Sequence, residues 1–127
     1  MPRILVIDDS PTMLYMVTEM IAQGGHETIT ASNGEQAICM AVNQQPDLVL
    51  LDVILPKLNG YEVCRQLKST PQTADIPVVM ITSKSKDKDR KWGIEQGADD
   101  YITKPFDADD LLDVIERFVR GRIGTES

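Results

Sequence analysis

Five short apolar runs alternate along the chain with longer amphipathic stretches. The runs are Ile4–Ile7, Thr28–Ala31, Leu48–Leu51, Val78–Ile81 and Tyr101–Thr103. Most of them are continuous rather than alternating, which is the pattern of strands that are buried on both faces. We therefore predict five strands of a parallel sheet with both faces covered.

The stretches between the runs carry apolar residues at helical spacing, which suits helices that lie on a sheet. The four clearest faces are Met13, Val17, Met20 and Ile21; Ala37, Ile38, Ala41 and Val42; Gly60, Val63, Cys64 and Leu67; and Leu111, Leu112, Ile115, Phe118 and Val119. A further helix over Lys86–Gln96 has only a thin apolar stripe, so we expect it to be weakly anchored. This alternation of strands and helices predicts an α/β fold.

Helix starts agree with this division. Ser10–Pro11 is an N-cap followed by proline at the first helical position. Ser32–Glu35 and Asn59–Glu62 have the spacing of a capping box, in which the first and last residues cap each other's backbone. We therefore expect helices to begin just after Ser10, Ser32 and Asn59.

The length of 127 residues fits one domain, which we place at residues 1–121, followed by a flexible tail at 122–127. The net charge of −7 disfavours nucleic-acid binding, which needs clustered cations. No apolar run approaches the roughly 20 residues of a membrane helix, and the first residues do not resemble a signal peptide. We therefore expect a cytoplasmic protein that does not bind membranes. Cys39 and Cys64 match no metal or redox motif and are interpreted as free thiols.

Polar residues follow four of the five predicted strands at the carboxyl end. They are Asp8, Asp9, Asp52, Thr82, Ser83 and Lys104. In parallel sheets of this kind, ligands bind beyond the carboxyl ends of the strands. Three carboxylates, one or two hydroxyl groups and an ammonium group are therefore expected to converge on one edge.

Each of these residues also has an ordinary explanation. Two aspartates after a strand commonly cap a turn or a helix, and Lys104 alone could be a solvated surface lysine. Their combination is more specific, because close carboxylates repel each other unless a cation lies among them. Mg²⁺ suits a small site of one or two carboxylates and phosphate oxygens. With such an ion, Asp52 could attack a phosphorus centre while Lys104 neutralises the transferring oxygens.

The chain closely resembles the receiver domain of bacterial two-component response regulators, and in particular the stand-alone, chemotaxis-regulator type. The matching motifs are Val6–Ser10, Leu50–Pro56, Asn59–Gly60, Ile76–Val78, Ile81–Thr82, Gly97–Tyr101 and Thr103–Phe106. The resemblance runs from Arg3 to about Arg120. It implies a flavodoxin-like, doubly wound sheet of five parallel strands in the order 2-1-3-4-5, with five flanking helices.

The resemblance also implies the roles of the site residues. Asp52 would be the phosphoacceptor, and Mg²⁺ would be held by Asp9, by Asp8 mainly through water, by Asp52 and by the backbone carbonyl of Ile54. Thr82 and Lys104 would contact the phosphoryl group. Pro105 would follow a cis peptide bond.

In such proteins, phosphorylation moves the residue at the Thr82 position and turns the aromatic residue at the Tyr101 position inward. The face made by the fourth helix, fifth strand and fifth helix then changes. Lys91 and Trp92 are possible contacts on this output face, although their segment could equally be a solvated surface. The expected partners are a histidine kinase or phosphotransfer protein and a downstream protein target, and the expected state is a monomer or a weak phosphorylation-dependent dimer.

Two other functions use similar residues. A magnesium-dependent aspartyl-phosphate phosphatase or phosphotransferase of the best-known family needs a second aspartate two residues after its nucleophile, where this chain has Ile54. A flavin or nucleotide carrier needs a phosphate loop after the first strand, where this chain has the acidic Asp8–Pro11. The sequence therefore favours a switch, not an enzyme, in chemotaxis or pilus-type motility. Whether it stands alone or belongs to a longer regulator stays open.

Overall fold

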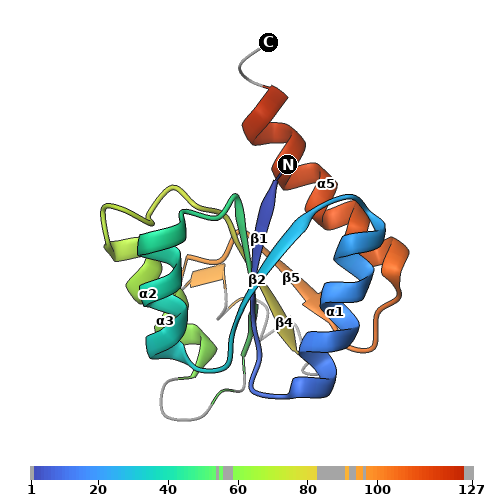
Figure 1. The fold of residues 1–127 in the computed structure, drawn as a ribbon. Coiled ribbons are helices and arrows are strands. Elements are labelled where there is room, and N and C mark those ends of the chain that lie inside the picture. The colour runs from blue at the N-terminus through green and yellow to red at the C-terminus, as the bar shows by residue number, and fades with distance from the viewer. Residues whose placement is uncertain are drawn as a thin grey trace.

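The computed structural model describes residues 2–53, 55, 59–82, 91, 94–95 and 97–124, with side chains described as far as residue 119. Strands and helices alternate along these residues (Figure 1). The elements are β1 (Arg3–Ile7), α1 (Pro11–Gln23), β2 (Glu27–Ala31), α2 (Gly34–Gln44), β3 (Leu48–Asp52), α3 (Gly60–Ser69), β4 (Val78–Thr82), β5 (Asp100–Thr103) and α5 (Ala108–Gly124).

The strands form one parallel sheet in the order β2-β1-β3-β4-β5. Every residue of β3 and β4 is buried, as their continuous apolar runs predict. The predicted doubly wound α/β fold is therefore confirmed. Most of the helix predicted over Lys86–Gln96 lies outside the described residues. The three residues of this range that are described, Lys91, Ile94 and Glu95, are helical.

Helices cover both faces of the sheet. Figure 1 shows α1 and α5 on one side and α2 and α3 on the other. Alternate residues of each strand point to opposite faces, so β1 contributes Leu5 and Ile7 to the core under α2 and α3, and Ile4 and Val6 to the core under α1 and α5. The two cores hold the sheet rigidly from both sides.

The helix starts follow two of the three expected caps. The Ser10 hydroxyl accepts a hydrogen bond from the Met13 amide at the start of α1, and the Asn59 side chain accepts one from the Glu62 amide at the start of α3. In α2 the cap is Asn33 rather than Ser32, so the helix begins one residue later than predicted. Asn33 caps the helix because the amide and hydroxyl groups of Ser32 both donate hydrogen bonds to the Gln36 side-chain oxygen instead.

At its carboxyl end α5 continues to Gly124, so the first residues of the predicted tail at 122–127 are helical. Among the described helices, none combines the length and the apolar character that crossing a bilayer requires.

Candidate functional site at the carboxyl edge of the sheet

The parallel register brings the predicted site residues to one edge of the sheet. Ile7 lies beside Leu51, so Asp8 and Asp52 follow neighbouring strands at the same level. Asp52 in turn lies beside Ile81, and Thr82 beside Thr103. Four residues that are far apart in the sequence, Asp8, Asp52, Thr82 and Lys104, are thereby carried to the ends of adjacent strands.

Asp8, Asp9 and Asp52 form an acidic cluster. One carboxylate oxygen from each lies within 4.8 Å of the others, and Asp8 and Asp52 are only 6% and 7% exposed while Asp9 is exposed. Mg²⁺ binds oxygen ligands at 2.0–2.1 Å, so two of its ligands are at most about 4.2 Å apart. Three ligands of an octahedral ion include adjacent pairs only about 2.9 Å apart, so the cluster fits a hard divalent ion once the carboxylates draw closer together.

Lys104 supplies the cation of the cluster. Its Nζ lies 3.7 Å from Asp8 Oδ2 and 3.6 Å from Asp52 Oδ2, and its side chain is 24% exposed. Three carboxylates and the one ammonium group that contacts two of them sum to a formal charge of −2. These like charges repel one another at this distance. A divalent cation bound among them would neutralise the remaining charge and relieve the repulsion.

The backbone around the site fixes each side chain. The Ser10 amide donates a hydrogen bond to Asp8 Oδ1 at 2.9 Å, which orients that carboxylate. The Lys104 amide donates to the Thr82 carbonyl at 2.7 Å, so the ends of β4 and β5 are held together. Thr82 is 1% exposed. The peptide bond between Lys104 and Pro105 is cis.

The start of α3 packs directly against the backbone at the carboxyl end of β3. The Gly60 amide donates to the Val53 carbonyl at 2.7 Å. A Cβ atom at Gly60 would lie 2.4 Å from the Asp52 carbonyl oxygen and 2.6 Å from the Val53 Cα. Only glycine permits this approach, which buttresses Asp52 from the side of α3.

Several residues predicted for the site or the output face lie elsewhere or outside the described residues. Tyr101 is buried in the core under α2 and α3. Lys91 is exposed, whereas Ile54 and Trp92 lie outside the described residues. His26 lies before the amino end of β2, at the opposite edge of the sheet, and both of its ring nitrogens are buried without a hydrogen-bond partner.

Neither thiol belongs to the site. Cys64 is buried in α3, and this burial raises the pKa of its thiol to about 11. Cys64 is therefore a neutral thiol near pH 7 and a poor nucleophile. Cys39 is exposed on α2, away from the carboxyl edge of the sheet.

An apolar groove beside the site was not predicted. Met13, Met16 and Met20 of α1 line it together with Lys104 and the two residues after it, Pro105 and Phe106, and its volume is about 300 Å³. Met16 is 45% exposed, which is unusual for so large an apolar side chain. The helical spacing of the methionines was visible in the sequence, but their position beside Lys104 follows only from the sheet order.

Comparison with known proteins agrees with this arrangement. Residues 4–116 match the sequence model of the response regulator receiver domain. The chain is 43% identical to the protein PilH of Pseudomonas aeruginosa over 121 residues, which are 95% of this chain and all of PilH. Several other relatives are longer, and the chain spans only 42% to 51% of their length.

Solved structures give the same result. The fold superposes on the chemotaxis protein CheY4 of Vibrio cholerae with a TM-score of 0.88 at 28% identity, covering 93% of this chain and 98% of CheY4. It superposes on the receiver domain of the sensor histidine kinase PA1611 of Pseudomonas aeruginosa with a TM-score of 0.86 at 27% identity, covering 93% and 97% of the two chains. That structure has a magnesium ion coordinated in its active site cleft.

Proposed function

Because the chain belongs to the response regulator receiver domain family of two-component signalling, we propose that it is a switch controlled by phosphorylation of Asp52. The observation that carries this proposal is the cluster of three carboxylates closed on one side by Lys104. Asp52 is the natural acceptor because it ends the central strand β3 and contacts both the acidic cluster and the lysine.

The residues divide the chemistry between them. A carboxylate oxygen of Asp52 attacks the phosphorus of a phosphohistidine on the donor protein. The new O–P bond forms as the P–N bond breaks, and its electron pair returns to the donor imidazole. Lys104 and the Thr82 hydroxyl then hold the phosphoryl oxygens. A magnesium ion held by Asp8, Asp9, Asp52 and the Ile54 carbonyl would supply further neutralisation of the developing charge.

The decisive experiment incubates the protein with acetyl phosphate and Mg²⁺ and measures the intact mass. We expect the wild-type chain to gain one acid-labile phosphoryl group, Asp52→Asn to gain none, and Asp109→Asn, an exposed control on α5, to behave like wild type. Labelling of Asp52→Asn to the wild-type level would refute Asp52 as the acceptor. Repeated turnover of an added phosphate monoester, measured as released inorganic phosphate, would favour the phosphatase alternative.

The apolar groove beside Lys104 would serve as the docking surface for the phosphodonor, which is a histidine kinase or phosphotransfer protein. A donor histidine must approach Asp52 past Lys104, so the donor surface would rest on α1 and on the segment after β5. Exposed methionines adapt to different apolar partners. Phosphorylation-dependent movement of Thr82, with Tyr101 responding in β5, would carry the signal to the output face.

Substitution Met16→Lys tests the donor surface. We expect the rate of phosphotransfer from the partner kinase to fall at least about tenfold, because a charge would be buried against the donor. Labelling by acetyl phosphate, which needs no protein surface, should be unchanged. Glu19→Lys, also on α1 but outside the groove, is the matched control. An equal loss with both phosphodonors would contradict the docking role.

The likeness to a chemotaxis protein supports chemotaxis or pilus-type motility as the process served. The expected setting is the cytoplasm, with Mg²⁺ as the cofactor and a further protein as the downstream target.

A further inference from the structure

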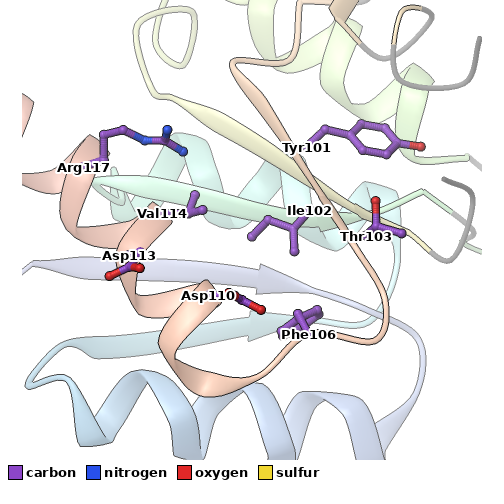
Figure 2. A pocket seen from close by; sticks show the side chains of 8 residues that line it. All are labelled: Tyr101, Ile102, Thr103, Phe106, Asp110, Asp113, Val114 and Arg117. Atoms are coloured by element: carbon purple, nitrogen blue, oxygen red, sulfur yellow. The ribbon is translucent and has the colours of Figure 1, made fainter. Parts of the chain in front are cut away.

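A second hollow lies on the opposite side of Phe106, between β5 and α5. Its volume is about 540 Å³, and it is lined by Tyr101, Ile102, Thr103, Phe106, Asp110, Asp113, Val114 and Arg117. Figure 2 shows that these side chains come from β5, from α5 and from the segment between them. The hollow is therefore built on β5, the strand that Lys104 directly follows.

The floor of the hollow is apolar. Ile102 on β5 is buried, and Val114 on α5 and Phe106 are half-buried (Figure 2). Volumes of 300 to 1,000 Å³ are typical of ligand pockets, and here charged side chains surround the apolar floor. This floor accommodates one or two apolar side chains of a partner.

The charges along α5 are arranged unusually. Asp113 and Arg117 are four residues apart, the spacing at which an aspartate and an arginine pair on a helix. Arg117 instead donates to the Asp100 carboxylate on β5, and its guanidinium group lies 5.4 Å from the centre of the Phe118 ring. Among the described residues that line the hollow, the one cationic side chain is thereby already neutralised.

Asp113 consequently has no ion-pair partner among the described residues, and Asp110 lies one turn before it on the same face. Asp110 has a local role, because its amide and carboxylate form a reciprocal cap with Asp107. Asp113 lies beyond the first turn of α5, where the helix dipole no longer favours a carboxylate. Two exposed like charges on one helix face disfavour each other, and a cation bound between them would relieve that repulsion.

We propose that the hollow binds a protein segment that inserts an apolar side chain between Ile102 and Val114 and pairs an adjacent lysine or arginine with Asp113 and Asp110. This proposal rests on the proposed function, since it gives the chemistry of the downstream target on the β5–α5 part of the output face. The apolar side chain supplies affinity and the cation supplies charge complementarity.

The position of the hollow also couples it to the phosphorylation site. Ile102 and Thr103 immediately precede Lys104, whose Nζ contacts Asp52. A change at Asp52 that pulls Lys104 therefore acts directly on the floor of the hollow. By linkage, a segment that binds the phosphorylated form more tightly must also stabilise that form to the same degree.

The test selects segments without assuming the target. A displayed library of random peptides is selected against the protein activated with beryllium fluoride and Mg²⁺, and the enriched peptides are synthesised and titrated. We expect enriched peptides to combine an aliphatic or aromatic residue with a neighbouring lysine or arginine. Acidic or uncharged enriched peptides, or no enrichment, would overturn the proposal.

Charge-neutral variants then locate the binding surface. Asp113→Asn should weaken binding by about threefold to tenfold and the double variant with Asp110→Asn by more, as expected for partly exposed ion pairs. Asp109→Asn removes the same charge from α5 outside the hollow and should leave binding unchanged. Equal losses for Asp113→Asn and Asp109→Asn would reduce the effect to net charge and overturn the proposal.

Asp100→Asn gives an independent check. It releases Arg117, which can then pair with Asp113, so peptide binding should weaken although no residue of the acidic pair is altered. Unchanged binding by Asp100→Asn would contradict the arrangement of charges on which the proposal rests.

Two further measurements distinguish binding of a basic segment from a failure of Asp52 phosphorylation and from self-association of the chain. Acetyl phosphate labelling of Asp52 in each variant should equal that of the wild type, so a failure of the proposed function is seen separately from a failure of the hollow. Sedimentation of the activated protein tests a second copy of the chain as the occupant. If the activated protein forms a dimer that Asp113→Asn abolishes, the occupant of the hollow is a second copy of the chain and not a basic segment of another protein. This result would overturn the proposal.

Discussion

Gly60 directly controls the geometry around Asp52, the proposed phosphoacceptor. Its missing side chain lets the first turn of α3 touch the backbone of Asp52 and Val53, neither of which can yield as a flexible side chain could. The amide of Gly60 also closes the hydrogen bond to the Val53 carbonyl. The position of Asp52 is thus set by a contact eight residues along the chain.

Gly60→Ala should therefore impair both stability and phosphorylation. The added methyl group must displace backbone, so we expect a loss of about 1–3 kcal/mol in the free energy of unfolding and slower labelling by acetyl phosphate. Gly25→Ala is the matched control, since its φ of +83° makes alanine unfavourable but a Cβ there meets nothing within 4 Å. It should lose stability by about 1 kcal/mol and label normally. Normal labelling of a folded Gly60→Ala protein would contradict the buttressing role.

At the scale of elements, a lysine joins α3 to the turn that enters β5. Lys68 Nζ donates to the Ile76 carbonyl at 2.9 Å and to Asp99 Oδ2 at 2.8 Å, and the same carboxylate oxygen accepts from the Val78 amide at 2.8 Å. Gly97, with a φ of +105°, lies over the lysine stem. This clamp fixes the start of β4 and the entrance to β5 relative to α3.

Removing the ammonium group while keeping the stem tests the clamp. We expect Lys68→Met to lower the free energy of unfolding by about 1–2 kcal/mol, a value reduced by the partial exposure of both partners. Arg65→Met, one turn earlier and exposed, should have little effect. In a double-mutant cycle with Asp99→Asn, urea unfolding should give a coupling energy of about 0.5 kcal/mol or more. Additive effects of the two substitutions would show that the contact contributes no stability.

The elements were largely predictable because each strand is a continuous apolar run that ends at a polar residue. Asp8, Asp52, Thr82 and Lys104 could be assigned to one edge on that basis alone. The clamp of Lys68, the contact of Gly60 and the pairing of Arg117 with Asp100 could not, because each depends on which distant elements become neighbours. The one-residue error at α2 arose because Ser32 and Asn33 are both good caps, and a hydrogen bond to Gln36 decides between them.

At the scale of the whole molecule, the acidic cluster makes stability depend on cations. Its carboxylates repel each other in the folded chain and separate on unfolding, so an ion that binds only the folded form stabilises it. At ten times its Kd, Mg²⁺ should add about 1.4 kcal/mol and raise the Tm by roughly 5 °C.

Thermal unfolding with and without MgCl₂ measures this effect. We expect Asp9→Asn to have a higher Tm than wild type without the metal, since one repelling charge is gone, and a smaller increase when Mg²⁺ is added. NaCl at matched ionic strength is the control for screening. An increase in Tm that NaCl reproduces, or that Asp9→Asn leaves intact, would argue against binding at the cluster.

The strand order has a consequence for the life of the chain before it is complete. Asp8 follows β1, and Asp52 and Thr82 end β3 and β4, whereas Lys104 follows the edge strand β5, which is the last strand to be synthesised. A nascent chain that has emerged only as far as β4 would carry the carboxylates without the ammonium group that faces them. Its three carboxylates would carry a formal charge of −3 until β5 brings Lys104 beside them.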